Sequence, residues 1–521
     1  MTEPTMPKVE TNAIEKESAM TDTRSSFRSI FKASAMIGSS AVISAGLGAL
    51  RAKSLAILLG PAGIGLMGAF TMIQELSRNM AQLGLTQSGV RQIAEAASTG
   101  DEQRIAITAL VLRRTTILFA SLGAFILWIC SGAVSKLTFG TEEQASSISL
   151  LSVALLLTVV ADGRGALLQG MRRMNAVAKL SIYGALFGTL ATIGIVIFAR
   201  ERGIVPSLIS TSIAYIGLAW WFSRKIGNTD IVVKADVAAK ETAQLLKLGV
   251  AFLASGLIMS GSEYIVRTFI IRMEGIEEAG LYQAAWTVGG LYVSFVLQAL
   301  AMDFYPRLVG VVEEHNLCNA AVNEQTNVSM LLAAPGIIAT ITFSSLVIYT
   351  FYSAEFSGSI VLLQWICMGM SLRIITTPMR FIIIAMNKRL VFFAVEATWA
   401  ALNVVTTWWG INTFGLEGVA IAFLLTNLLH ALVIYKLASS LTGFRWSSEN
   451  LRTGSCFILA CLVTLVVQRS LPQWVALSLG TFITLASLWY SVRRTLVLTG
   501  NSNGFRGLRG MMRLGKRQNS D

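Results

Sequence analysis

Charge is scarce in this sequence. Of its 521 residues only 14% are Asp, Glu, Lys or Arg, whereas 54% are hydrophobic, and the mean hydropathy is +0.63. A soluble domain carries roughly 25% charged residues, so the composition indicates a polytopic integral membrane protein instead. At about 20 apolar residues per span, the chain has room for about twelve to fourteen transmembrane helices.

Histidine and cysteine are also scarce. The only histidines are His315 and His430, and the five cysteines show no paired spacing, which argues against a disulfide framework and a metal centre. Two histidines are too few for the usual nucleophilic sets, and the sequence has no GxxxxGK[ST] phosphate loop. We therefore expect neither an enzyme nor an ATP-hydrolysing chain, and we expect no cofactor and no metal.

Long hydrophobic runs predict an all-α fold with about 14 transmembrane helices. These runs lie near residues 31–58, 62–90, 113–134, 147–170, 176–198, 204–223, 244–272, 279–308, 328–352, 358–385, 389–410, 415–437, 453–468 and 474–492. Residues 1–28 are polar and contain no apolar run, so they are not a cleavable signal peptide and are predicted to form a disordered tail.

Lysine and arginine predict the orientation of the chain. With an even number of spans, nearly all loop cations fall on the side of the two termini, and only five fall on the other side, namely Lys136, Arg200, Arg202, Arg272 and Arg469. Cytoplasmic loops carry the positive excess in membrane proteins, so both termini are predicted to be cytoplasmic. The net charge of +13 then reflects orientation and contact with anionic lipids, and nucleic acid is not an expected partner.

A weak internal repeat appears at an offset near 215 residues. Its matches are Gly65-Leu66 with Gly280-Leu281, Met171 with Met386, and Gly203 with Gly415. Six spans per repeat give both halves the same orientation, a plan in which transporters place their site between the halves. The predicted domains are a tail at 1–28, a lobe at 29–225, a loop at 226–243, a second lobe at 244–440, two further helices at 441–494 and a basic cytoplasmic tail at 495–521.

The stretch from Gly60 to Arg91 carries a polar face inside an apolar helix. Thr71, Glu75, Arg78 and Gln82 recur at helical spacing on one side. Ionisable groups in hydrocarbon cost several kcal/mol each, so this side is predicted to face protein or water. With Gln74 and Asn79 nearby, it reads as the wall of a polar cavity.

Other predicted spans carry polar groups as well. Seven cations inside spans are unexplained by orientation, namely Arg51, Lys53, Arg78, Arg164, Arg267, Arg373 and Arg380. Buried guanidinium groups suit phosphate, so the candidate substrate-binding residues are Arg78, Arg267, Arg51, Arg373 and Arg164. The candidate polar lining comprises Gln74, Glu75, Asn79, Gln82, Ser260, Gln283 and Gln298. The candidates for coupling to an ion are the carboxylates Glu263, Asp162, Asp303 and Glu396, because a desolvated carboxylate can load and release a proton.

A structural interpretation of the same charges stays open. Cations near span ends, such as Arg51, Lys53, Arg164 and Arg380, can extend to the membrane surface. Glu75 with Arg78, and Glu263 with Arg267, have the spacing of ion pairs within one helix. Either arrangement would need no substrate.

Several stretches resemble one known family. They are LAILLGPAGIGLMGAFTMIQELSRNMAQLGLTQSGVRQIAEA, LLQGMRRMNAVAKLSIYGAL, AGLYQAAWTVGGLY and FGLEGVAIAFLLTNLLHALVIY. They are similar to landmarks of the polysaccharide transporter family, the Wzx-type flippases of O-antigen and other lipid-linked oligosaccharides. That family is part of the multidrug/oligosaccharidyl-lipid/polysaccharide exporter superfamily. The resemblance covers the chain from about Phe27 to Tyr490.

The resemblance implies a function in the bacterial inner membrane. Members translocate an undecaprenyl-diphosphate-linked oligosaccharide by alternating access between two six-helix lobes, and a polymerase and a chain-length regulator of the same pathway are expected partners beside membrane lipids. A lipid II flippase and a cation-coupled drug exporter of the same superfamily remain alternatives, although the many cations disfavour a cationic drug. A polysaccharide polymerase or glycosyltransferase is disfavoured by the short outside loops, and a membrane scaffold by the cost of the polar stripes.

Overall fold

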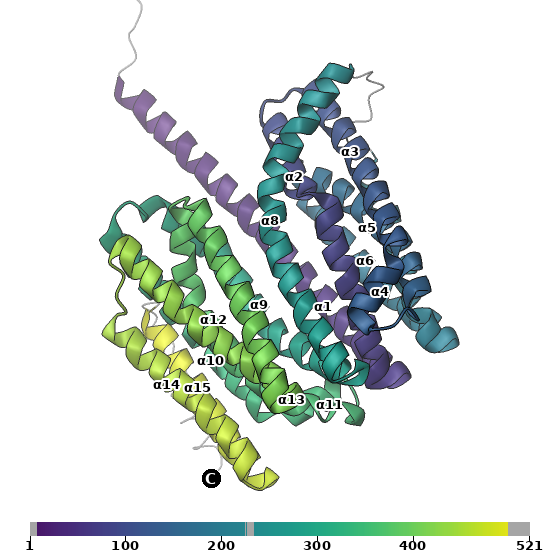
Figure 1. Ribbon diagram of the computed structural model, residues 1–521. Coiled ribbons are helices and arrows are strands. Elements are labelled where there is room, and N and C mark those ends of the chain that lie inside the picture. Colours follow the sequence, from purple (N-terminus) through teal and green to yellow (C-terminus); the bar gives the residue numbers. More distant parts are fainter. Residues whose placement is uncertain (1–7, 225, 227–233, 499–521) are drawn as a thin grey trace, which may run out of the picture. The chain divides into compact units, whose positions relative to one another are not determined.

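The computed structural model describes residues 8–224, 226 and 234–498, and this part of the chain is helical, without β-strands (Figure 1). The first half contains α1 (Lys8–Gln82), α2 (Leu85–Ser98), α3 (Glu102–Ile129), α4 (Ser131–Phe139), α5 (Ala145–Gly170), α6 (Met174–Ala199), the 3-10 helix η1 (Arg200–Gly203) and α7 (Ile204–Ser223). The second half contains α8 (Ala235–Met273), α9 (Ile276–Val311), α10 (His315–Thr342), α11 (Ser344–Phe351), η2 (Ala354–Phe356), α12 (Ser359–Ala385), α13 (Arg389–Thr442), α14 (Ser448–Ser470) and α15 (Gln473–Leu498).

The helices have the length and apolarity of membrane spans. In the described part of the chain, eight continuous helical segments are long and apolar enough to cross a bilayer, or ten if two bent pairs each form one span. Three of them, Gly38–Gln82, Met174–Ser223 and Arg389–Thr442, have 45, 50 and 54 residues, about twice the length that one span needs. The all-α membrane fold is thus confirmed, whereas the number of 14 spans stays a prediction.

Sharp bends divide these three long segments. At Gly60 the backbone of α1 has φ 65° and ψ −171°, directly before Pro61. A side chain disfavours positive φ, so glycine is suited to this position, and proline has no N–H to lose at the start of the helix that follows. Gly415 bends α13 in the same way, and η1 separates α6 from α7.

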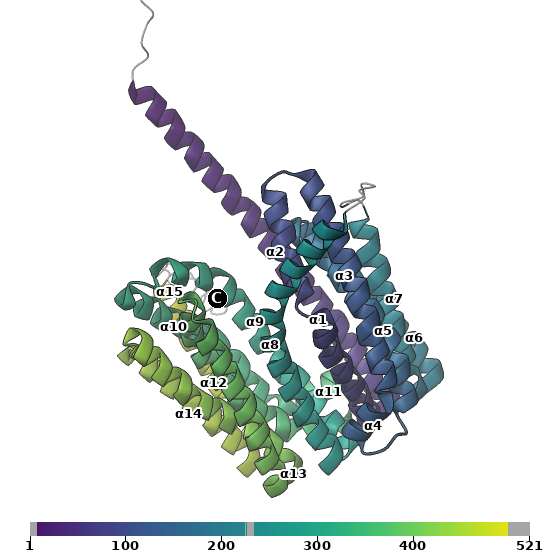
Figure 2. The same ribbon diagram turned by 45° about the horizontal axis from the view of Figure 1, so that its top comes forward.

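Two compact units divide the described helices. Unit 1 comprises the described residues within 1–51, 77–130 and 147–253, and unit 2 comprises those within 52–76, 131–146 and 254–521. In unit 1, α3, α5, α6 and α7 run alongside one another (Figure 2), with apolar cores such as Leu112 with Leu167 and Leu180 with Ala219. In unit 2, α9, α10, α12 and α13 share a core around Phe304, Ile382 and Phe444. The lobes predicted from the sequence are defined by the internal repeat, whereas these two units are defined by which residues contact one another.

The repeat is visible in the backbone. Three pairs of residues with positive φ are each 215 residues apart, namely Gly60 and Gly275, Arg172 and Asn387, and Arg200 and Gly415. The sequence paired Gly203 with Gly415, but the turn geometry assigns Arg200 to Gly415. Gly203 then corresponds to Gly418. The recurrence of unusual backbone conformations at one offset supports the predicted duplication.

Equivalent segments of the repeat also touch each other within unit 2. A Cβ atom on Gly65 would lie 1.9 Å from the carbonyl oxygen of Ile276, and one on Gly280 would lie 1.9 Å from that of Pro61. The contact is reciprocal, because Pro61 to Gly65 corresponds to Ile276 to Gly280 at the same offset. A reciprocal contact is what a two-fold relation between identical surfaces produces. Glycine is required here because backbone meets backbone.

Several predicted boundaries are wrong. The helix predicted over 62–90 ends at Gln82, because Leu83 and Gly84 take positive φ and Gly84 approaches the Gly249 carbonyl. The connection between the predicted spans 62–90 and 113–134 is largely helical, in α2 and α3, and the loop predicted at 226–243 is helical where α8 begins. Where a disordered tail was predicted at 1–28, the structure describes helix from Lys8 onward. The basic tail falls outside the described residues from 499 onward.

Candidate functional site

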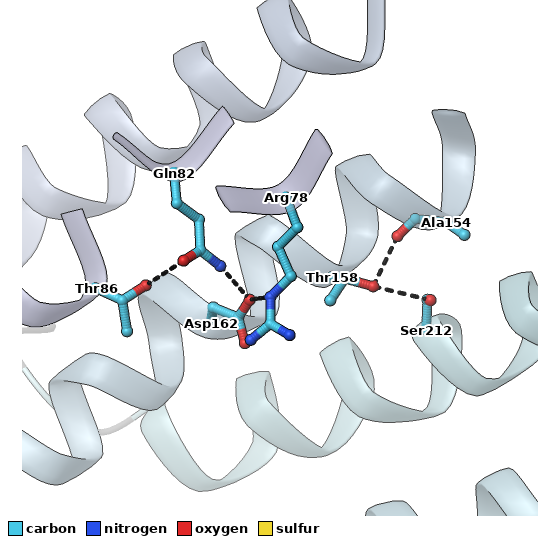
Figure 3. A network of polar contacts seen from close by, with 7 residues as sticks. All are labelled: Arg78, Gln82, Thr86, Ala154, Thr158, Asp162 and Ser212. Carbon is cyan, nitrogen blue, oxygen red and sulfur yellow. Dashed lines mark hydrogen bonds and ion pairs between the residues drawn. The ribbon is translucent and has the colours of Figure 1, made fainter. Parts of the chain in front are cut away.

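A buried carboxylate on α5 is the centre of a polar cluster in unit 1. The Arg78 Nε donates to the Asp162 Oδ2 at 2.7 Å, and the Gln82 Nε2 donates to the same oxygen at 2.5 Å. Figure 3 shows both side chains reaching the carboxylate from α1, while Thr86 donates to the Gln82 amide oxygen. Arg78 and Gln82 are four residues apart, so one helix face delivers both donors.

The Arg78–Asp162 ion pair has a buried acid and an arginine that stays partly accessible to solvent. The Asp162 side chain is 6% exposed, whereas the Arg78 side chain is 32% exposed. Hydrogen bonds to an ionised carboxylate are about twice as strong as neutral ones, so Asp162 fixes the position of the guanidinium. The Arg78–Asp162 pair connects two helices, and the pairing predicted within α1, from Glu75 to Arg78, stays a prediction.

Arg164 lies two residues after Asp162 but contacts different groups. Its Nη1 is 3.4 Å from the Ser223 hydroxyl on α7, and its Nε is shielded from solvent with no hydrogen-bond partner among the described residues. The Nε of Arg113, on α3, is in the same situation. Arg113 is not among the site residues predicted from the sequence.

Unit 2 contains a second polar cluster, which surrounds a small cavity of about 20 Å³. The volume suffices for about one water molecule. Arg380 Nη1 lies 3.1 Å from Glu396 Oε1, an ion-pair distance, although the N–H is not directed at that oxygen. The Arg373 guanidinium lies 5.9 Å from the centre of the Trp399 ring. The cavity is lined by Met259, Arg373, Thr376, Thr377, Arg380, Glu396, Trp399, Asn427, His430 and Ile434.

Deeply buried polar groups complete this second cluster. Glu396, Asn427 and His430 are 5%, 4% and 6% exposed, and the His430 Nε2 has no hydrogen-bond partner among the described residues. A buried polar atom without a partner costs about 1–3 kcal/mol, so a water molecule or ion in the cavity would stabilise the cluster. Asn427 and His430 were missed as site residues. Their spacing of three on an apolar helix was the available signal.

The other predicted residues are dispersed. On α8, Glu263 and Arg267 make no ion pair with each other, and the Ser260 hydroxyl donates to the Gly256 carbonyl. Gln283 donates to Thr287 within α9. Of the remaining lining residues, Gln298 and Glu75 are exposed, Gln74 and Asn79 are half-buried, and so is the cation Arg51. The side chain of Asp303 lies outside the described residues.

Lys53 has a specific contact in unit 2. Its Nζ donates to the backbone carbonyl of Tyr349 at 2.7 Å and to that of Tyr352. These carbonyls lie at the C-terminal end of α11, where a helix leaves its last acceptors unpaired and attracts cations. Lys53 therefore caps a helix.

Comparisons with known proteins agree with this architecture. A family model described as polysaccharide biosynthesis protein matches residues 30–312. The chain is 22% identical over 408 residues to the lipid III flippase of Escherichia coli (strain K12). The aligned region covers 77% of this chain and 96% of that relative. The lipid II flippase MurJ, in an inward closed conformation, superposes with a TM-score of 0.65 at 12% identity, over 89% of this chain and 99% of MurJ.

A second transporter has the same fold. An inward-facing multidrug resistance MATE family transporter of the MOP superfamily superposes with a TM-score of 0.58 at 16% identity, over 77% of this chain and 98% of that one. The family model spans more than half of the 521 residues, and the resemblance seen in the sequence is confirmed. The chain therefore belongs to the polysaccharide biosynthesis protein family, and its fold is that of the MOP-superfamily transporters.

Proposed function

We propose that this protein is a flippase that moves an undecaprenyl-diphosphate-linked oligosaccharide across the bacterial inner membrane by alternating access. The observation that carries the proposal is the family match over residues 30–312. A relative named as a lipid III flippase, of which 96% is covered, supports it. In this proposal the cargo is the repeat unit of a surface polysaccharide such as O-antigen or common antigen. Both termini are cytoplasmic, and a polymerase and a chain-length regulator act after transport.

The arginines of the two clusters fit the diphosphate of such a cargo. A guanidinium binds phosphate through two parallel hydrogen bonds, and Asp162 holds Arg78 in one orientation. In unit 2, Arg373 and Arg380 line the cavity with a single carboxylate, that of Glu396, which lies at ion-pair distance from Arg380, so the lining has excess positive charge. Arg51, Arg164 and Arg267 are further proposed phosphate ligands. The amides and hydroxyls predicted as polar lining would then hydrogen-bond the glycan.

The same clusters offer carboxylates for ion coupling. Asp162 and Glu396 are each buried beside an arginine, so a phosphate that binds the arginine competes with the carboxylate for it. Such competition would couple cargo binding to protonation of the carboxylate. Glu263 and Asp303 remain weaker candidates. In this mechanism the chain transports and does not catalyse.

The test is transport by the purified protein in proteoliposomes. A lipid-linked oligosaccharide is placed in the inner leaflet, and its appearance in the outer leaflet is followed with a lectin added outside. We expect transport by the native chain, and an at least tenfold slower rate for Arg78→Ala and Arg373→Ala at equal protein level. Arg114→Ala, an exposed arginine outside both clusters, is the matched control. Transport that does not exceed that of protein-free vesicles would refute the proposal.

Lipid II is the second candidate cargo, favoured by the superposition on MurJ over 89% of the chain. It too carries a polyprenyl diphosphate. Competition in the same vesicles separates the two: an excess of lipid II should leave oligosaccharide transport unchanged if the oligosaccharide is the cargo. A cation-coupled drug exporter is disfavoured, because a cationic drug would meet the excess positive charge of the unit 2 cluster.

A further inference from the structure

A cavity of about 530 Å³ lies in unit 2 where α14 begins and α15 ends. We call it the headgroup cavity. Neither helix supplies a residue to the two clusters described above. The headgroup cavity is lined by Ser448, Glu449, Arg452, Thr453, Trp489, Tyr490, Arg493, Arg494 and Val497.

Positive charge dominates the headgroup cavity. Three arginines and one carboxylate line it. The carboxylate, that of Glu449, forms an ion pair with Arg494, in which Glu449 Oε1 lies 2.5 Å from Arg494 Nη2. The Arg493 guanidinium lies 5.2 Å from the centre of the Trp489 ring, and neither Arg452 nor Arg493 has a carboxylate at ion-pair distance within the described ranges. The positive end of the α14 dipole adds to this charge. The cavity therefore attracts an anion.

An apolar cleft continues inward from this cavity. Thr453 and Tyr490 line both spaces, so the cleft, of about 220 Å³, begins where the headgroup cavity ends. It runs between α10, α14 and α15, and most of its lining is apolar, with Leu331, Ile338 and Ile483 as examples. A ligand that fills both spaces has an anionic end and a hydrocarbon end.

The surroundings place this ligand at a membrane interface. Only 17% of the apolar stretch of α15 is buried within the protein, so most of this helix faces lipid. Trp489 and Tyr490, near its end, are 54% and 39% exposed. Tryptophan and tyrosine gather where the hydrocarbon meets the headgroups, and arginine at that level interacts with anionic lipid.

We propose that the headgroup cavity binds the phosphate headgroup of an anionic membrane phospholipid, with an acyl chain in the apolar cleft. Arg452 and Arg493 would ligate the phosphate, and Thr453 and Tyr490 would lie at the level of the glycerol. The lipid is a bound component of the membrane and not the cargo, since its ligands are separate from both clusters. This proposal does not depend on the transported substrate.

Native mass spectrometry of the full chain in detergent tests the proposal, with dioleoyl phosphatidylglycerol, dioleoyl phosphatidylcholine and inorganic phosphate as probes. We expect phosphatidylglycerol to bind at least tenfold more tightly than phosphatidylcholine. The variant Arg452→Ala/Arg493→Ala/Arg494→Ala should lose most of that preference, because each basic residue near an anionic lipid contributes about a fivefold effect. Arg493→Ala alone, at an exposed position, should lose about fivefold and retain the fold.

The matched control is Lys234→Ala/Lys240→Ala/Lys247→Ala, which removes three exposed charges in and before α8 and should leave lipid binding within twofold. Ala486→Phe, at an exposed position of the apolar cleft, should weaken phosphatidylglycerol and leave phosphate unaffected. Equal binding of the two lipids, or equal losses in the arginine and lysine variants, would overturn the proposal. Displacement of phosphatidylglycerol by an equal concentration of phosphate would identify a free-anion site and overturn it as well.

Discussion

The interiors of the two units occupy matching places in the repeat but differ in chemistry. In unit 1 the Thr158 and Ser212 hydroxyls bond to each other at 3.0 Å, and the residues 215 positions later are Arg373 and Asn427, which both line the unit 2 cavity. In the same register, the bonded pair Ser44 and Ser181 corresponds to Met259 and Glu396, and Tyr215 corresponds to His430.

Charge is where the two interiors diverge. Asp162 corresponds to Thr377, and the partner of Asp162, Arg78, corresponds to Val293. Unit 1 thus pairs a buried acid with an arginine brought by α1, whereas in unit 2 two arginines and one acid line the cavity. The backbone plan of a duplicated fold is kept by packing and turn geometry, while polar positions inside it can change without moving the helices. The two halves can thus share one scaffold and do different work.

The largest expected effect comes from the buried Arg78–Asp162 pair in unit 1. Asp162→Leu should lower the free energy of unfolding by about 3 kcal/mol, because breaking a buried pair leaves a charge uncompensated. This loss of stability is at the low end of what broken buried ion pairs cost, since the Arg78 side chain is 32% exposed to solvent. Arg78→Leu/Asp162→Leu should recover at least half of the loss. Thermal and denaturant unfolding in detergent measure it, and a double variant as weak as the single one would contradict a balanced pair.

Removal of one arginine in unit 2 should cost less. Arg380→Met leaves Glu396 near Arg373, whose electrostatic neighbours include both residues, so we expect a loss of about 1–2 kcal/mol. Glu396→Gln should cost more than Arg380→Met, because it leaves two arginines without an acid in the cavity. The same unfolding measurements apply. Equal losses of stability in the two variants would contradict an excess of positive charge in the unit 2 cavity.

The most uniform effect is expected at the backbone contact between the two repeats. Gly65→Ala and Gly280→Ala each place a Cβ atom 1.9 Å from a carbonyl oxygen, and overpacking of this kind costs about 1–3 kcal/mol. The two losses should agree within about 0.5 kcal/mol because the contact is reciprocal. Gly48→Ala, which meets nothing within 4 Å, should be neutral or slightly stabilising. Unequal losses would argue against a two-fold relation.

Sequence patterns predicted most of the helices and part of the site. Apolar length located most of the helices but missed several of their ends, and the periodicity of α1 placed Arg78 and Gln82 on one face, where both reach Asp162. The same pattern gave no partner for them, because Asp162 is 84 positions away along the chain. Short-range cues also failed at Gln82, where the helix stops since Gly84 meets Gly249. His430 was passed over because the two arginines beside it in the cavity, Arg373 and Arg380, come from another helix, α12.

Membrane residence, all-helical structure and the repeat near 215 residues follow from the amino-acid order alone. The reason is that a bilayer forces every span to be about 20 apolar residues long and to satisfy its own backbone. Which charges neutralise one another is a tertiary property. Ion-pair energy falls off with distance and depends on burial, so it was fixed only when packing brought Arg78 to Asp162 and Arg380 to Glu396.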